Sequence, residues 1–410
     1  MNRRKLNTSK VFISIMLFIG LTAYLVSCTN DNQFVKTNPI VPINKVTDLL
    51  SVKTTTAPTI DGVVEAFWDN CPKLEFSTEV PEVTGDVFRG YVGNIIPRVT
   101  LRSAYDANNI YFLAEWDDPT KSIARAPWYF NPTTKLWAQE KGSYDFDPAT
   151  NGGKTRQPFY EDKISMLWNI DNSVNGWNSA TCYKSCHTGL PAGDGSSRHY
   201  TNFSSEKIDM WHWKSVRGGL NGGLQFDDQY QDNTYPNGRK GDDGVGAYTN
   251  NSQKLKITGT ATEVSVPKYI IPGRQNEFWL MESDFASGGV AKLVTAVDAN
   301  GILTLEGGTT INPNTDTEYQ RDGDFVGKKA VPGIYIKDSG YGGSKGDISC
   351  TAKYTGSGWI MEFTRALTTS DKVNDVDFSS LADQYFGFAV FENAQIAHSI
   401  KPNLLLKFEK

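Results

Sequence analysis

The stretch VTLRSAYDANNIYFLAEWDD, residues Val99–Asp118, indicates the fold class of this chain. Apolar side chains alternate with other residues on both sides of the turn-forming residues 106–109. A period of two is the pattern of a strand that buries one face, and two such segments joined by a short polar turn predict a β-hairpin.

The same alternation recurs elsewhere, whereas helical periodicity is sparse and is best at Phe378–Tyr385. Separated strands, with 37 glycines and 18 prolines in the chain, favour an all-β fold, a β-sandwich with few short helices. We expect long loops at Pro119–Tyr160 and Gln231–Asn251. The further strands predicted are KISMLWNID (163–171), GWIMEFTRAL (358–367) and YFGFAVFEN (385–393).

Composition and charge exclude some classes of protein. The 410 residues are 39% hydrophobic, which is enough for a large core. Lys and Arg number 41 against 46 Asp and Glu, and no basic block stands out. Nucleic acid is therefore not an expected partner.

The N-terminus has the pattern of an export signal. A basic start, MNRRKLNTSK, precedes the apolar run VFISIMLFIGLTAYLVS, and the next residue, Cys28, completes a stretch that resembles the bacterial lipoprotein box. A membrane-spanning helix is the alternative, although about 17 residues is the lower limit for one. We expect residues 1–27 to be a signal peptide, 28–56 a flexible linker and 57–410 the folded domain. Acylated Cys28 would anchor an outer-membrane lipoprotein of the cell envelope, on its periplasmic or surface face.

The segment TCYKSCHTGL contains Cys182, Cys186 and His187, one residue longer than the C-x-x-C-H of covalent haem attachment. Export permits both covalent haem and disulfides. A structural zinc site would need four ligands, and only His199 lies nearby as a further candidate. From the residues alone, haem, a disulfide loop and a metal site all stay open.

The segment EKIDMWHWKSVRGG, Glu206–Gly219, resembles the haem-binding subunit family of ethylbenzene dehydrogenase and related dimethyl-sulfoxide-reductase-type enzymes. The resemblance extends from Ala57 to the C-terminus and is weakest in Gln253–Asp347. It implies a β-sandwich haem-binding domain, related in fold to family 9 carbohydrate-binding modules. Those subunits bind haem b through a methionine and a lysine, whereas this chain offers two cysteines and a histidine.

For this chain the resemblance implies haem c, with its iron, attached at Cys182 and Cys186. His187 would replace the methionine as an axial ligand. His398, in AVFENAQIAHSI, lies near the place of the lysine and is the expected second ligand, with His199 as the alternative.

Three residues of the WHWK segment are candidates for contacts to the cofactor. Trp211 and Trp213 are more often core residues than parts of a haem wall, and contact with the haem is compatible with either place. Lys214 and Arg217 are usually solvated charges, although a haem propionate is a plausible acceptor for either. Strand alternation turns His212 away from the face that the tryptophans share, so it is not expected to be a ligand.

The two remaining cysteines and one acidic loop are further candidate sites. If haem uses the middle pair of cysteines, Cys71 and Cys350 are left as an expected disulfide in an oxidising compartment, whereas without haem four cysteines allow three pairings. Asp242 and Asp243 suggest calcium, but they lack the spacing of a dedicated loop, and solvent exposure is the preferred interpretation.

The leading hypothesis is an exported, lipid-anchored c-type cytochrome that transfers electrons to redox partner proteins and is not itself an enzyme. The chain has no nucleotide-binding loop and no H-E-x-x-H motif. The alternative is a carbohydrate-binding surface lipoprotein, suggested by the fold and by the aromatic residues Trp128, Tyr129 and Trp137. A colourless protein with a structural metal or disulfide site is a third possibility.

Overall fold

A computed structural model gives the fold of the 410-residue chain. It describes residues 47–80, 95–142, 145–147, 153–156, 159–185, 199–218, 224–235, 237–275, 279–320 and 327–410, with only the backbone of 145–147 and 153–156. The expected signal peptide, Cys28, Cys186 and His187 lie outside these residues. In the part of the chain that is described, no helix is both long enough and apolar enough to cross a bilayer.

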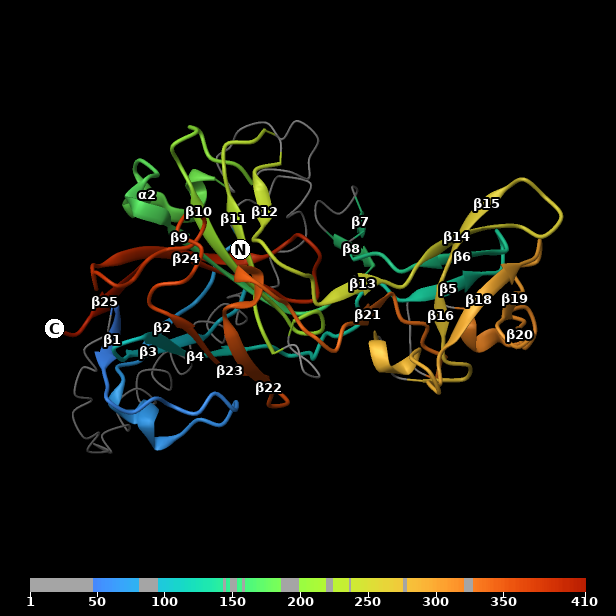
Figure 1. The fold of residues 1–410 in the computed structure, drawn as a ribbon, viewed down its shortest axis with the longest axis horizontal. Helices are drawn as coiled ribbons and strands as arrows, with labels where there is room; N and C mark the ends of the chain where they lie inside the picture. The colour runs from blue at the N-terminus through green and yellow to red at the C-terminus, as the bar shows by residue number, and fades with distance from the viewer. Residues whose placement is uncertain are drawn as a thin grey trace, which may run out of the picture. The chain divides into compact units, whose positions relative to one another are not determined.

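One large sheet of 12 strands dominates the fold and curls into two facing layers (Figure 1). The expected hairpin, β3 and β4, lies in one layer, and β9, β10 and β24 lie in the other. The all-β sandwich predicted from the sequence is therefore confirmed. In hydrogen-bonded order the strands are β12 (Arg239–Gly241), β11 (Asp227–Gln231), β10 (Ile208–Lys214), β9 (Lys163–Asn169), β24 (Gln384–Phe391), β25 (Ser399–Phe408), β1 (Leu49–Lys53), β3 (Val99–Tyr105), β4 (Asn109–Asp117), β23 (Gly358–Ala366) and β22 (Ser349–Tyr354), with β2 (Leu74–Phe76) paired to β3.

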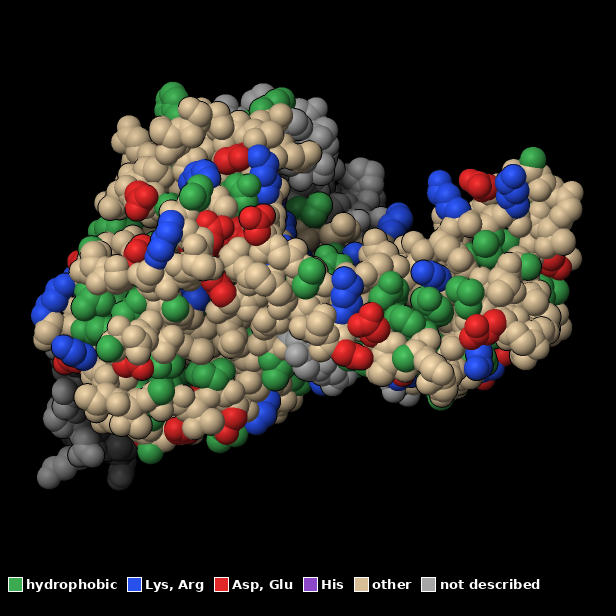
Figure 2. All heavy atoms as spheres, in the orientation of Figure 1, with side chains coloured by type: hydrophobic (Ala, Val, Ile, Leu, Met, Phe, Trp, Pro, Cys, Tyr) green, Lys and Arg blue, Asp and Glu red, His purple; other side chains and the backbone are tan. Residues whose placement is uncertain are grey.

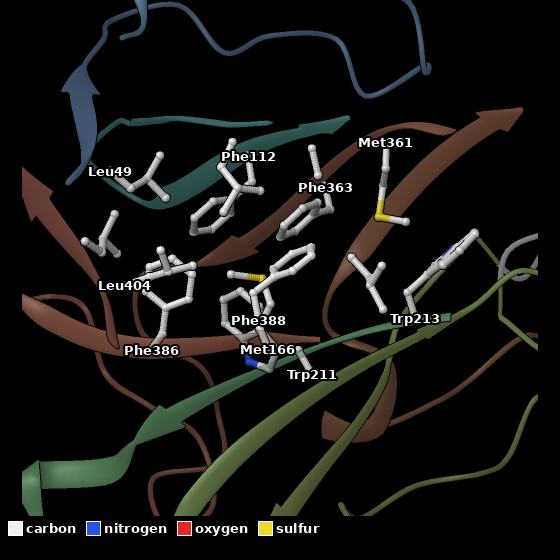
Figure 3. Packing of buried hydrophobic residues seen from close by; sticks show 14 of the residues in the cluster. Leu49, Phe112, Met166, Trp211, Trp213, Met361, Phe363, Phe386, Phe388 and Leu404 are labelled. Carbon is white, nitrogen blue, oxygen red and sulfur yellow. The ribbon is translucent and has the colours of Figure 1, made fainter. Parts of the chain in front are cut away.

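The main core fills the space between the two layers. Trp211 and Trp213 of β10 point into it, toward Phe363 and Met361 of β23 (Figure 3). The ring centroids of Trp211 and Phe363 are 6.4 Å apart. Both tryptophans are fully buried, so β10 contributes two of the largest side chains of the core.

Smaller sheets occupy the segments that were expected to be long loops and the segment where the resemblance is weakest. β5 and β6 fall within Pro119–Tyr160, because that segment carries apolar side chains that a second core cluster buries. β12 and β13 fall within Gln231–Asn251, where they pair with β11 and β21. The strands are β5 (Trp128–Asn131), β6 (Leu136–Gln139), β7 (Asp145–Asp147), β8 (Gly153–Arg156), β13 (Tyr248–Asn250), β14 (Gln253–Lys256), β15 (Glu263–Val266), β16 (Tyr269–Ile270), β17 (Trp279–Met281), β18 (Lys292–Val297), β19 (Leu303–Leu305), β20 (Thr310–Ile311) and β21 (Ile334–Ile336).

Helices are few and short, as the sequence predicts. The expected helix at Phe378–Tyr385 is wrong, because a turn follows Phe378 and β24 begins at Gln384. The described helices are α2 (Trp177–Ala180) and the 3-10 turns η1 (Ala66–Asn70), η4 (Ile170–Asn172), η5 (Thr181–Lys184), η6 (Glu282–Asp284), η7 (Thr317–Tyr319) and η8 (Ser344–Gly346).

The expected linker, residues 28–56, contains a strand at its end. β1 pairs in parallel with both β25 and β3, and the side chain of Leu49 is fully buried. The compact unit spans Val46–Lys410, so the fold begins before residue 57. The alternation of LLSVK is too short to distinguish from a linker until its two partner strands are known.

The expected disulfide between Cys71 and Cys350 is wrong, because both residues are buried free thiols. Cys71 packs against Tyr111 and Leu113 of β4, whereas Cys350 lies in the main core together with Phe112 of the same strand. Since successive side chains of a strand point to opposite faces, the two thiols lie on opposite faces of the sheet. A disulfide requires Cβ atoms that approach each other, which this arrangement prevents.

Candidate functional site

The outer face of β9, β10 and β24 forms the floor of a cavity. Strand register aligns side chains from the three strands, for example His212 with Ser165 and Ala389. The cavity has a volume of about 350 Å³, within the size range of cofactor sites. We call it the histidine cavity, and its lining residues are Tyr160, Lys163, His199, Met210, His212, Lys214, Arg217, Asn237, Arg239, Phe391, Gln395, Ile396 and His398.

A narrower, mostly apolar pocket adjoins the histidine cavity and contains Cys182. The two share His199, Met210, Phe391 and His398. Cys182 lies against β24 at Gly387, which has no side chain. A Cβ atom at position 387 would lie only 3.3 Å from the sulfur of Cys182, so any other residue there would crowd the thiol. The apolar pocket is lined by Ser165, Leu167, Cys182, His199, Met210, Gly387, Phe388, Ala389, Phe391, His398 and Ile400.

His398 is held in the tautomer that can bind a metal ion through Nε2. Its Nδ1 lies 2.7 Å from the carbonyl oxygen of Ile396, and a carbonyl can only accept a hydrogen bond. Nδ1 therefore carries the proton, which leaves a lone pair on Nε2 of the neutral ring. A backbone carbonyl on the opposite nitrogen is the usual way in which proteins orient an imidazole ligand.

His212 has the opposite tautomer. The Arg239 guanidinium donates a hydrogen bond to Nδ1 of His212 over 3.0 Å, so Nδ1 must be the acceptor. The proton of the neutral ring is then on Nε2, which is buried and has no hydrogen-bond partner. A buried donor without a partner is costly, and an acceptor on a ligand in the cavity would satisfy it.

The three histidines are kept neutral. Burial, followed by the charge of Arg239 and the neighbouring His398, lowers the pKa of His199 to about 3. Burial also lowers the pKa of His398 to about 4, against the opposing hydrogen bond to Ile396. The pKa of His212 falls well below its ordinary value through burial and through Lys214 and other nearby cations. Neutral imidazole is the form that binds metal ions.

Positive charge dominates the polar lining. Four of the described residues that line the cavity are Lys or Arg, and none is Asp or Glu. Lys214 is paired with Asp227, and Arg217 with Glu161, from just outside the lining. Lys163 instead donates to the carbonyl oxygen of Gln395 over 2.8 Å.

The positive charges that line the cavity affect the pKa of Lys163. Burial and then the nearby guanidinium of Arg217 lower the pKa of Lys163 well below its usual value, although Glu161 opposes the shift. A ligand with carboxylate groups would offset this repulsion and bind the cationic side chains through charge-assisted hydrogen bonds.

The structure brings together only some of the predicted site residues. Cys182, Lys214 and His398 line the two adjoining pockets, as does the alternative ligand His199. Trp211 and Trp213 are buried in the main core on the other face of β10, which was the alternative to a place at the haem wall.

His212 and Met210 are the residues that the sequence argument missed. Alternation correctly turned His212 away from the tryptophans, but the tryptophans do not face the cavity. Alternation along β10 could have located both residues. If Trp211 and Trp213 face the core, then Met210, His212 and Lys214 lie on the opposite face of the strand.

Taken together, the two pockets can bind a ligand that has an apolar body, carboxylate groups and a metal ion that accepts an imidazole nitrogen. The apolar body would lie near Cys182, the carboxylates near Lys163 and Arg217, and the metal near Nε2 of His398. The unpartnered Nε2–H of His212 fits a carboxylate acceptor.

A comparison with solved structures finds weak likeness to a carbohydrate-binding module. Two similar solved structures are a family 9 carbohydrate-binding module from Caldicellulosiruptor kristjanssonii in complex with glucose and with cellotriose. Their identities to this chain are 11% and 12%, and the TM-scores are 0.25 and 0.27. The matches cover 88% of this chain and 95% or 93% of those chains. Likeness at this level carries no argument about ligands.

A comparison with curated proteins finds no match. The family model described as ethylbenzene dehydrogenase matches residues 65–402, which is most of the chain and includes every described residue of the two pockets. The chain therefore belongs to the ethylbenzene dehydrogenase family.

Proposed function

We propose that this protein is an exported, lipid-anchored haem protein that transfers electrons, with haem c in the histidine cavity. The observation that carries the proposal is the convergence of His398, His199 and Met210 on a space that Cys182 also borders. Bound haem would supply a reversible one-electron iron couple, and the protein would set its potential through the ligands and their burial.

Each part of the site has a role in this proposal. His398 offers Nε2 to the iron, oriented by the carbonyl of Ile396. His212 donates its Nε2–H to a propionate, and Lys163 and Arg217 balance the propionate charges. Cys182 forms one thioether at the apolar end of the site. These roles hold and orient the cofactor, as an electron-transfer protein with redox partners requires.

The proposal also includes the rest of the cysteine–histidine motif and the lipid anchor at Cys28. Cys186 would form the second thioether, His187 would be the other axial ligand, and acylated Cys28 would hold the protein at the outer membrane; these three residues lie outside those that the structure describes. Multiple acyl chains on one cysteine would hold the protein stably, because a single chain gives only marginal binding.

Haem attachment is tested by expressing the full chain in a host that matures c-type cytochromes. We expect a haem-staining band that persists on a denaturing gel after acid-acetone extraction. The double variant Cys182→Ala with Cys186→Ala should lose this band. Cys71→Ala is the matched control, because Cys71, like Cys182, is a buried cysteine but lies in a different cluster.

A colourless wild-type protein from that host would reject the proposal. Haem that stains the native protein but is extracted by acid-acetone would instead indicate non-covalent binding in the same cavity. Anchoring has its own test, because Cys28→Ala should release the protein from membranes.

The structure removes one of the two observations that motivated the carbohydrate-binding alternative, the exposure of its aromatic residues. Trp128 and Trp137 are buried in the second core cluster, and their indole nitrogens donate to backbone carbonyls of Asn251 and Gly301 over 2.8 and 2.9 Å. They therefore do not form an exposed platform with Tyr129 for a sugar to stack on, and we propose no second function.

A further inference from the structure

Five aspartates from separate parts of the chain meet beside β11, away from the histidine cavity. Carboxylate oxygens of Asp228, Asp347 and Asp375 lie within 4.8 Å of one another, and so do those of Asp242, Asp371 and Asp375. The two groups share Asp375. Two ligand atoms on opposite sides of a calcium ion stand about 4.8 Å apart, since each bond is about 2.4 Å, so either group can surround one ion.

The fold assembles this cluster from three segments. Asp228 lies on β11, and the backbone N–H of Asp242, directly after β12, donates to the carbonyl oxygen of Asp228 over 3.2 Å. Asp347 follows η8, and Asp371 and Asp375 follow β23. Alternation along β11 points Asp228 away from Asp227, which pairs with Lys214 of the histidine cavity.

Several oxygens of the cluster are buried without any partner. Asp375 is 4% exposed and Asp242 is 6% exposed, yet neither carboxylate makes a hydrogen bond through either oxygen. Oδ2 of the fully buried Asp228 and Oδ1 of Asp347 are also without partners. Buried carboxylate oxygens without donors are costly, and in folded proteins they are paired or coordinate a metal ion.

Nearby cations do not neutralise the cluster. The buried guanidinium of Arg365 is bound to a sixth aspartate, Asp209, over 2.9 Å. Lys345 is paired with Asp227 over 2.5 Å. Burial, then repulsion from Asp209 and from other members of the cluster, raises the pKa of Asp228 well above its usual value and that of Asp242 to about 9. Arg365 and Lys345 thus balance only part of the charge of the cluster, whereas the backbone N–H groups of Val373 and Asn374 donate to Asp371 and lower its pKa.

We propose that this aspartate cluster is a calcium-binding site that fastens β11, the η8 turn and the segment after β23 to one another. The ligand set of oxygens alone is that of a hard cation, and irregular clusters of carboxylates suit the flexible coordination of Ca²⁺. Mg²⁺ demands near-ideal octahedral geometry and retains its waters, so it fits a buried cluster of this kind less well. The site is independent of the proposed haem.

The test uses the full-length protein, treated with EDTA and then dialysed. Titration with CaCl₂ in a calorimeter should give saturable binding with a Kd of about 1 mM or tighter. Thermal unfolding should show a Tm several degrees higher in saturating CaCl₂, because a ligand that binds only the folded state stabilises it. Absence of both effects would overturn the proposal, and an equal shift with MgCl₂ would overturn the assignment to calcium.

A pair of variants separates ligation from a general effect of charge. Asp375→Asn removes the shared ligand, whereas Asp243→Asn removes an equal charge from an exposed neighbour of the cluster. In EDTA, D375N should be at least as stable as the wild type, because one buried repelling carboxylate is gone. In CaCl₂ it should lose the calcium-dependent rise in Tm, which D243N should keep. Equal loss in both variants would contradict a site at this cluster.

Discussion

The two best-defined histidines of the cavity differ in which nitrogen carries the proton. A carbonyl acceptor fixes the proton of His398 on Nδ1, and a guanidinium donor fixes that of His212 on Nε2. The same residue type is therefore prepared for two tasks: His398 to give a lone pair to a metal, and His212 to give a proton to an acceptor. A neighbouring donor or acceptor at about 3 Å decides the difference.

Replacing His398 with Ala should change the iron coordination of the haem-loaded protein. Loss of one axial imidazole opens a coordination position, so the ferric spectrum should shift toward high spin and carbon monoxide should bind the reduced form. Absorption spectroscopy measures both. His212→Ala is the control, which should stay low-spin. An unchanged spectrum in H398A together with a shifted one in His199→Ala would assign the ligand to His199.

At the scale of an element, β10 separates the core from the cavity. Trp211 and Trp213 fill the space between the layers, while Met210 and His212 line the cavity. A slip of one residue in its pairing with β9 would exchange these faces. The burial of the Trp211 and Trp213 side chains in the core therefore places His212 on the cavity face of β10.

Trp213→Ala should affect stability and leave the cofactor site unchanged. Removing a fully buried indole should lower the free energy of unfolding by about 3–5 kcal/mol in urea titrations. The folded fraction should bind haem with the wild-type spectrum. A spectral change without loss of stability would place the cofactor on the core face of β10.

Asp118, directly after β4, and Asp162, directly before β9, are buried carboxyl groups whose protonation links stability to pH. Burial and the neighbouring Glu392 raise the pKa of Asp118 to about 7, and burial and Asp118 raise that of Asp162 well above its usual value. A raised pKa in the folded state means that the protonated form is favoured by folding. That contribution is complete below about pH 4 and is lost as the pH rises through about 7.

We therefore expect Asp118→Asn to be more stable than the wild type by about 2 kcal/mol at pH 8 and by much less at pH 5. Asparagine retains the acceptor oxygen for the backbone N–H of Thr120, which lies 3.0 Å from Oδ1 of Asp118. Urea unfolding at both pH values measures the difference. Asp117→Asn is the adjacent control, and an equal effect there would rule out the buried pair as its cause.

At the scale of the whole molecule, β1 joins the two halves of the large sheet. It pairs in parallel with β25 on one side and β3 on the other, and no other strand in the described part of the chain connects these two. The first strand of the fold is thus inserted beside the last. Closure of the sandwich therefore requires contacts between the two ends of the domain.

Truncation should reveal this requirement. A chain that starts at Val46 keeps β1 and should unfold at the wild-type Tm, whereas a chain that starts at Thr54 lacks it. Loss of the strand exposes two sheet edges, so we expect a fall in Tm of roughly 10 °C or more, or loss of cooperative unfolding. Circular dichroism measures both. Equal Tm values for the two chains would show that β1 is dispensable.

The sequence by itself determined the strands and the class of fold. Alternation in Val99–Asp118 predicted β3 and β4, and the same pattern located β9, β23 and β24. The family resemblance directed attention to His398 and Lys214, which the structure places in one cavity. These features are local or carried by short motifs, so a single segment contains the information.

Only the tertiary structure decided which faces and segments meet. The tryptophans of β10 lie in the core, so His212 lies in the cavity. Cys71 and Cys350 lie on opposite faces of the sheet. Asp242 lies together with four other aspartates. Strand periodicity defines two faces but does not say which one another layer will cover. That choice depends on pairing between strands hundreds of residues apart, which local patterns in the sequence do not encode.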